Sequence, residues 1–239
     1  MHSQLGLSHF WEQGDGVSHA VAVILLLLSV ASWCIIIGKA LSHWRASRTH
    51  SRALAAFWNA DSLPQALEAI RIEDASGILA GLALSGAHAA QAHEQHAARG
   101  IGAGVHASEF VTRCLRQSIV ASQARIEQGL TFLASVGSTA PFIGLFGTVW
   151  GIYHALVGLT GTSQVVLDKV AGPVGEALIM TAAGLFVAIP AVLAYNAFTR
   201  ANRLVLAQLD GFAHDLHAYL TTGVRLAAGQ SVASLAKAA

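Results

Sequence analysis

Residues 171–198 read AGPVGEALIMTAAGLFVAIPAVLAYNAF and decide the fold of this chain. Glu176 stands at the head of an apolar run, Ala177 to Phe198, that contains no charged residue. About 20 consecutive apolar residues cross a bilayer as a helix, so this run predicts a membrane span. A carboxylate at the edge of such a span, or inside it, costs roughly 2.5–3.5 kcal/mol on insertion scales. We therefore expect Glu176 to face a bundle interior or a water path, where it takes and releases a proton. The alternative is that it caps the helix N-terminus in the interface.

Two further apolar blocks lie upstream of this run, and together the three predict an all-α membrane protein. Hydrophobic residues make up 54% of the chain and charged residues only 11%, against about a quarter in soluble domains. We expect three transmembrane helices, with long helices extending into the cytoplasm. The predicted segments are an outer N-terminus (1–16), transmembrane helix 1 (17–38), a helical cytoplasmic segment (39–129), transmembrane helix 2 (130–159), an outer hairpin (160–171), transmembrane helix 3 (172–198) and a cytoplasmic helical tail (199–239).

The charges beside the spans predict the orientation. Residues 1–16 contain Glu12 and Asp15 but no lysine or arginine, whereas Lys39 and several arginines follow the first span. Basic residues stay on the cytoplasmic side, so the N-terminus and the hairpin face outward while the middle segment and the tail face the cytoplasm. An acidic flank is the reverse of a signal-peptide n-region, so we expect the first span to be retained. The net charge of +1 gives no case for nucleic-acid binding.

Turn and capping residues predict the helices of the cytoplasmic segment. Asp61-Ser62-Leu63-Pro64 reads as a helix start, because proline is tolerated in the first turn. Breaks are expected at residues 73–77 and at the glycine-rich stretch 100–104. From Ser108 to about residue 158 we expect one uninterrupted helix. The third span should continue past Arg203, since apolar residues recur there at roughly helical spacing.

Small residues form stripes along spans two and three. Gly137, Gly144, Gly151 and Gly158 recur every seven residues, and span three has a matching stripe that includes Thr181 and Gly184. In lipid, helices associate by close packing of such small-residue faces. We therefore expect these glycines to mediate helix pairing within and between subunits.

The histidines do not predict a metal site. His93 and His96 are spaced i, i+3, as are His214 and His217, but neither pair has a third ligand nearby in the sequence. We expect no metal and no cofactor. Without a nucleophile–base set or a phosphate-binding loop, the chain is not expected to be an enzyme. His154 in span two has two open interpretations: it faces a lumen, or it bonds a neighbouring helix.

Two stretches of spans two and three resemble a known family. Residues 139–151, TAPFIGLFGTVWG, and 171–196, AGPVGEALIMTAAGLFVAIPAVLAYN, are similar to hallmark stretches of the MotA/TolQ/ExbB proton-channel family, and most similar to its ExbB and TolQ branch. The three-span layout with a short outer hairpin matches as well. The resemblance implies that Glu176 and Thr148 line a lumen and that Thr181 joins them. The open alternative is that Thr148 and Thr181 are packing threonines that bond their own backbone carbonyls.

The same resemblance implies an assembly. It implies a homopentamer in the inner membrane of a Gram-negative bacterium, with the N-terminus periplasmic and the C-terminus cytoplasmic. Spans two and three would line a lumen that holds a dimer of the single-span partner ExbD, whose Asp binds the transported proton. The complex would use the proton-motive force to energise TonB, which powers outer-membrane uptake of siderophores and vitamin B12. Membrane phospholipids are further expected partners, and nucleic acid is not.

Three other functions stay open at this point. The first is a TolQ-type role in outer-membrane integrity, which the sequence favours less than the ExbB role. The second is a flagellar stator subunit of the MotA type, which the three spans disfavour because such subunits have four. The third is a small channel or scaffold without proton coupling.

Overall fold

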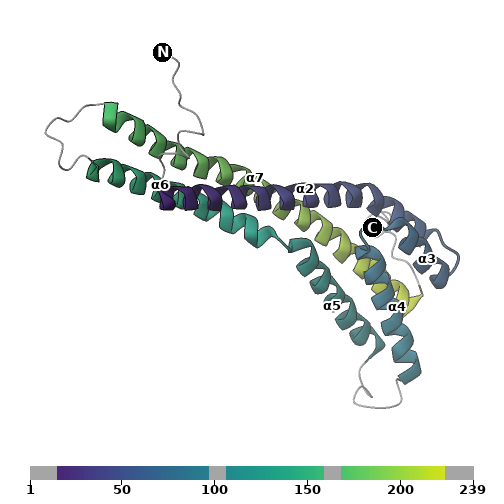
Figure 1. The fold of residues 1–239 in the computed structure, drawn as a ribbon. Helices are drawn as coiled ribbons and strands as arrows, with labels where there is room; N and C mark the ends of the chain where they lie inside the picture. Colours follow the sequence, from purple (N-terminus) through teal and green to yellow (C-terminus); the bar gives the residue numbers. More distant parts are fainter. Residues whose placement is uncertain (1–14, 97–105, 159–167, 224–239) are drawn as a thin grey trace, which may run out of the picture. The chain divides into compact units, whose positions relative to one another are not determined.

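The computed structural model describes residues 15–96, 106–158 and 168–223, and the regular structure in these ranges is α-helical throughout (Figure 1). The helices are α2 (Gly16–Trp58), α3 (Leu63–Glu73), α4 (Ile78–His96), α5 (Ala107–Glu127), α6 (Leu130–Val157) and α7 (Asp168–Thr222). The all-α fold class is thereby confirmed. Three stretches are long and apolar enough to cross a membrane by length and composition: Gly16–Trp58, Ala107–Val157 and Gly172–Thr222. The predicted break at 100–104, most of the outer N-terminus and much of the hairpin lie outside the described residues, and the orientation stays a prediction.

Several predicted helix limits are confirmed. Helix α3 begins at Leu63 after the N-cap residue Ser62, with a proline in its first turn, and ends at Glu73. Helix α4 begins after the predicted break, at Ile78. Helix α7 continues past Arg203 to Thr222, as the apolar spacing indicated.

The prediction of one uninterrupted helix from Ser108 to about residue 158 is wrong. Helix α5 ends at Glu127 and α6 begins at Leu130, with Gly129 between them at φ 83°. This left-handed conformation is open to glycine at no steric cost but interrupts the right-handed helix. The Cβ of any other residue at this position would also lie 3.3 Å from Ile35 Cγ2.

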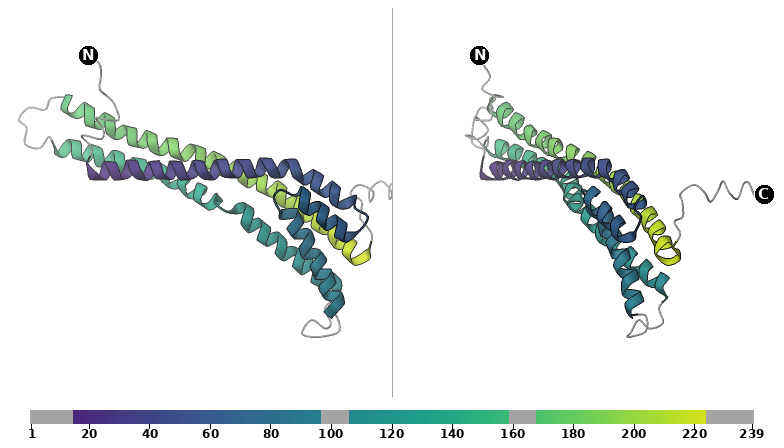
Figure 2. Two further views of the ribbon diagram at one scale, coloured as in Figure 1. Left: turned by 45° about the vertical axis from the view of Figure 1, so that its right-hand side comes forward. Right: turned by 90° about the vertical axis from the view of Figure 1, so that its right-hand side faces the viewer.

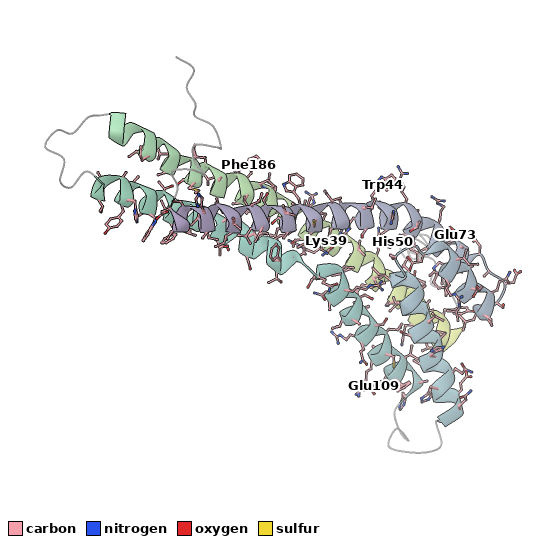
Figure 3. The ribbon with its side chains drawn as sticks, viewed as in Figure 1. Lys39, Trp44, His50, Glu73, Glu109 and Phe186 are labelled. Atoms are coloured by element: carbon pink, nitrogen blue, oxygen red, sulfur yellow. The ribbon has the colours of Figure 1, made fainter. Side chains whose placement is uncertain are left out.

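The chain divides into two compact units, the first of which joins the chain up to Lys39 with Gly129–Thr199. In it, α6 and the first half of α7 run side by side, in Figure 1 and in both views of Figure 2. Its buried apolar core comes from all three helices and includes Val21, Leu25, Leu133, Val136, Ala140, Met180, Val187, Ala188 and Ala191. Large apolar side chains also cover the outside: Phe142 is 69% exposed, and Phe186, which is labelled in Figure 3, is 70% exposed. A surface this apolar suits contact with lipid or with other membrane helices.

The second unit joins Ala40–Gln128 with the chain from Arg200 onward. Its core contains the side chains of Phe57, Ile70, Leu79, Leu82, Val111, Leu115, Leu209, Phe212 and Leu216. Phe57 and Phe212 meet edge to face, with ring centroids 5.2 Å apart, a favourable arrangement for aromatic pairs. This unit therefore has a hydrophobic core of the kind found in water-soluble helical proteins.

A buried polar cluster fixes the turn between α3 and α4. The Asp74 carboxylate accepts hydrogen bonds from Ser76 N and Ala80 N, each at 3.0 Å, and from the Ser76 hydroxyl at 2.6 Å. His50 of α2 is also buried, and its Nε2 lies 3.2 Å from Ser76 Oγ. Asp74 thus satisfies the Ala80 N–H in the first turn of α4, which the helix itself leaves unbonded, and the Ser76 N–H in the turn before it.

Candidate functional site

The backbones of α6 and α7 come very close where two glycines face each other. A Cβ atom placed on Gly184 would lie 2.6 Å from Ala140 O and 3.1 Å from Gly144 Cα. A Cβ atom on Gly144 would lie 2.5 Å from Met180 O and 3.0 Å from Gly184 Cα. Ordinary contacts of Cβ atoms begin near 3.4 Å. The backbones therefore come together at a distance that only glycine permits at both positions.

The other predicted packing glycines differ in their surroundings. Gly137 faces Val192 of α7, and a Cβ atom on Gly151 would lie 2.9 Å from Ala177 Cβ. Gly158 lies just beyond α6, where a Cβ atom would meet only carbonyl oxygens of its own helix, at 3.6 and 3.7 Å. The stripe of Gly137, Gly144 and Gly151 thus runs along α7, whereas a Cβ atom on Gly158 would meet no other helix within 4 Å in the described part of the chain.

One turn of α6 beyond the glycine crossing, the two predicted threonines meet. Thr148 Oγ1 lies 2.5 Å from Thr181 Oγ1, and Thr148 is only 6% exposed. The Thr148 hydroxyl is also within hydrogen-bond distance of Ala177 O on α7, at 2.9 Å, and of Gly144 O on its own helix, at 3.1 Å. A polar contact between two helices thus lies inside an otherwise apolar interface.

This arrangement limits what the threonines can do. A hydroxyl carries one hydrogen and two acceptor lone pairs, so Thr148 donates to one oxygen at a time and accepts from Thr181 when it bonds a carbonyl. The contact joins two helices of one subunit and adds no charge. It has the geometry of a packing contact; a lumen-lining role for the same two residues stays a prediction.

The side chain of Glu176 lies outside the described part of the structure. Its backbone belongs to α7, directly before Ala177, whose carbonyl oxygen is close to the Thr148 hydroxyl. On a regular helix Glu176 and Thr181 are about 140° apart. The site therefore consists of a described threonine pair and a neighbouring backbone position that carries the acid.

A second polar cluster joins the start of α2 to α6, and the sequence did not predict it. Asp15 Oδ2 accepts a hydrogen bond from Trp150 Nε1 and lies 3.5 Å from His154 Nε2, while Asp15 Oδ1 accepts one from Ser18 N at 2.9 Å. His154 thus has a partner at the N-terminal end of α2, which is the second of its two open interpretations. In the sequence, the only indication of this cluster was that Asp15 precedes the first span and His154 lies within the second.

The electrostatics of Asp15 follow from these contacts. Burial raises the pKa of its carboxyl, but the hydrogen bonds from Trp150 and Ser18, together with the nearby His154 ring, outweigh burial. The net result is a pKa below the ordinary value of 3.8. The carboxylate is therefore stabilised in its charged form.

The two histidine pairs noted in the sequence belong to the second unit. His217 Nε2 lies 3.1 Å from both the hydroxyl and the carbonyl oxygen of Ser108. The His93 ring lies 6.3 Å from that of Phe110, and the His96 side chain is outside the described residues. Within residues 15–96, 106–158 and 168–223, no three His, Cys, Asp or Glu side chains come together as metal ligands would.

Comparison with known proteins places the chain among membrane transport proteins. Residues 87–210 match the family described as the MotA/TolQ/ExbB proton channel family. The biopolymer transport protein ExbB of Xanthomonas campestris pv. campestris is 45% identical over 233 residues, covering 94% of this chain and 92% of that protein. The protein of the same name from Neisseria meningitidis serogroup B is 40% identical over 216 residues, covering 90% and 97%. The Tol-Pal system protein TolQ of Pseudomonas aeruginosa is 46% identical over 112 residues, which is 47% of this chain and 48% of that protein.

Proposed function

Because the chain belongs to the MotA/TolQ/ExbB proton channel family, we propose that it is the ExbB-type subunit of an inner-membrane complex that uses the proton-motive force to power TonB-dependent outer-membrane uptake. The observation that carries this proposal is the share of this chain that the ExbB and TolQ proteins each match. The two ExbB proteins named above match 94% and 90% of this chain at 45% and 40% identity, whereas the TolQ match extends over 47% of it. The likeness to ExbB therefore includes the second unit and the first span as well as the shared channel helices.

The proposed assembly is a homopentamer around an ExbD dimer, with TonB as the protein that receives the energy. The N-terminus faces the periplasm and the C-terminus the cytoplasm. The exposed apolar faces of α6 and α7 support this assembly, because they offer a large surface to other membrane helices. Phe142, Phe146 and Val149 on α6 are more than half exposed in the single chain, as are Leu178, Ile179 and Phe186 on α7.

We assign the proton pathway to Glu176, Thr148 and Thr181. Each proton that crosses releases roughly 2.3 kcal/mol per 100 mV of membrane potential. Proton binding to the acid of the partner helix would remove its charge and weaken its attraction to hydroxyls and water near Glu176. The neutral helix then moves against the surrounding ring. The threonine hydroxyls supply neutral polar contacts beside that path without the cost of burying a charge.

The test is complementation of a strain that lacks the gene. The chain is expressed with its own partner proteins, and growth on iron supplied as a siderophore complex is measured. Glu176→Ala should abolish this growth while the complex still assembles. The matched control is Glu68→Ala, which removes an exposed acid of α3 that lies 4.0 Å from Arg71 and should leave growth unchanged. Normal growth of the Glu176→Ala strain would refute the proton role.

A TolQ-type role is the second candidate, favoured only by the 46% identity to the Pseudomonas aeruginosa protein over 112 residues. It predicts that deletion causes detergent sensitivity while iron uptake stays normal. The neighbouring genes provide an independent test. A single-span partner gene beside a TonB-like gene supports the ExbB role, and a Tol–Pal cluster supports the other.

A further inference from the structure

Helix α2 carries a basic and aromatic face just after its apolar stretch. Leu41, Trp44, Arg45 and Arg48 are all exposed, Leu41 at 43% and Trp44 at 54%. At 100° per residue these four side chains lie within about 100° of one another around the helix. Figure 3 shows Trp44 on the opposite side of α2 from the buried His50. This part of α2 therefore has one face in the core of the second unit and one face free.

The arginine at position 48 is held beside the tryptophan. Arg48 Cζ lies 4.0 Å from the centre of the Trp44 ring, which is a cation–π contact. This contact turns the guanidinium back by one helical turn, toward the apolar end of α2. A guanidinium that lies on a ring keeps N–H groups at its edge, which can bind a phosphate in bidentate fashion.

The depth of these groups matches the headgroup layer of a bilayer. Measured from Gly38, the last residue of the predicted span, a rise of 1.5 Å per residue places the backbone of Leu41 about 4.5 Å and that of Trp44 about 9 Å along the axis. Side chains on a helix lean toward its N-terminus, which is here the membrane side, so the Trp44 ring lies nearer the hydrocarbon than its backbone. The polar layer on each side of the hydrocarbon is about 5–8 Å thick. The backbone of Arg48 lies about 15 Å beyond Gly38, but its contact with Trp44 brings the guanidinium back to the level of the indole ring. Tryptophan is the side chain typical of this depth.

The charge of this stretch selects the kind of lipid. Residues 16–60 contain no aspartate or glutamate, so no acid in α2 neutralises Arg45 and Arg48. A zwitterionic headgroup would leave part of this positive charge uncompensated, whereas an anionic phosphate would match it. Basic residues beside a membrane span attract anionic lipids in this way.

We propose that Leu41, Trp44, Arg45 and Arg48 form a binding site for the phosphate of an anionic phospholipid in the cytoplasmic leaflet. Trp44 and Leu41 contact the upper acyl chain, and the two guanidinium groups bind the headgroup phosphate. The site requires that α2 spans the membrane. It does not depend on proton coupling, so it can fail without affecting the proposed function.

The test measures lipid retention by the purified full-length complex. Native mass spectrometry follows titration with phosphatidylglycerol or phosphatidylcholine in mixed micelles. The wild-type complex should retain phosphatidylglycerol preferentially. Arg45→Gln with Arg48→Gln should lower this preference at least tenfold, since each basic residue near an anionic surface contributes about fivefold. Raising the salt concentration should weaken the wild-type preference.

The matched control removes the same charge elsewhere. Arg52 lies about 21 Å beyond Gly38 along the axis, outside the headgroup layer, and Arg71 is an exposed residue of α3. Arg52→Gln with Arg71→Gln should change the preference by less than threefold. Should the first double variant fail to fold, Arg45→Lys with Arg48→Lys retains the charge but not the bidentate geometry, and should bind with intermediate preference.

Three outcomes would overturn the proposal. Equal retention of the two lipids by the wild-type complex would show that no anionic headgroup is selected. An equal loss in the control variant would show a general effect of charge. If the Arg45→Gln, Arg48→Gln variant retains phosphatidylglycerol but loses a co-purifying protein, the face binds an acidic protein segment instead.

Discussion

Replacing Gly184 by alanine should separate α6 from α7 and destabilise the membrane-spanning unit. The new Cβ atom would lie 2.6 Å from Ala140 O, so the helices must move apart by about 0.8 Å to reach an ordinary 3.4 Å contact. The obstacle is backbone on both sides and cannot rotate away. Overpacking of this kind typically costs 1–3 kcal/mol. We expect a loss of about 2 kcal/mol in the free energy of unfolding, with some of it arising from a longer Thr148–Thr181 contact.

The assay is unfolding of the purified complex in mixed micelles of increasing SDS fraction, followed by circular dichroism. The matched control is Gly38→Ala in α2, where a Cβ atom would meet nothing within 4 Å. Gly144→Ala should resemble Gly184→Ala, because its Cβ would lie 2.5 Å from Met180 O. The double variant should lose less than the sum of the two, since one separation relieves both clashes. If Gly184→Ala unfolds at the same SDS fraction as Gly38→Ala, the close crossing of the two helices is refuted.

Three further predictions concern polar contacts. Thr148→Val and Thr181→Val should each lower the free energy of unfolding by about 0.6–1.7 kcal/mol, and a double-mutant cycle should show that the two effects are coupled. The double variant should impair siderophore-dependent growth more than membrane insertion. Intact growth of the double variant would support a packing role alone. Asp15→Asn should destabilise the protein at pH 6, because the folded state lowers the pKa of this carboxyl and so gains stability only from the charged form. The difference should shrink as the pH falls below the ordinary pKa of 3.8 and vanish only below the lowered pKa of the folded state. A penalty that persists below that range, or one that His154→Ala leaves unchanged at pH 6, would contradict this. Asp74→Ala should lower the thermal stability of the complex by the equivalent of about 2–3 kcal/mol, since it leaves the N–H groups of Ser76 and Ala80 unbonded. Asp74→Asn should recover part of that loss; equal stability of the two variants would argue against the capping role.

The spans and most helix limits were predictable because they depend on local composition. Runs of apolar residues identify the membrane segments, and Pro64 and Gly77 lie at helix ends for reasons that the neighbouring residues already show. The interruption at Gly129 was not predictable in this way. A glycine within a helical pattern is compatible with helix or with a left-handed turn, and the choice is made by tertiary packing, here beside Ile35.

The candidate site was predictable only in part. The family resemblance identified Thr148 and Thr181, and the small-residue stripes indicated which faces of the two helices meet. The cluster of Asp15, Trp150 and His154 joins residues more than 130 positions apart. No periodic pattern connects such residues. From the sequence alone, Asp15 is only an acid beside the first span and indicates the side of the membrane on which the N-terminus lies. A contact between distant segments requires the fold.

The hydrogen bond between Thr148 and Thr181 can run in either direction, because either oxygen can be the donor. The same heavy-atom positions therefore accommodate two hydrogen arrangements with opposite local dipoles. Rotation of the two O–H bonds exchanges them without shifting a backbone atom or opening the tight seam beside Gly144. In surroundings of low permittivity a reversible dipole responds strongly to a charge that approaches or leaves. An interface too close-packed to yield mechanically is thereby still polarisable.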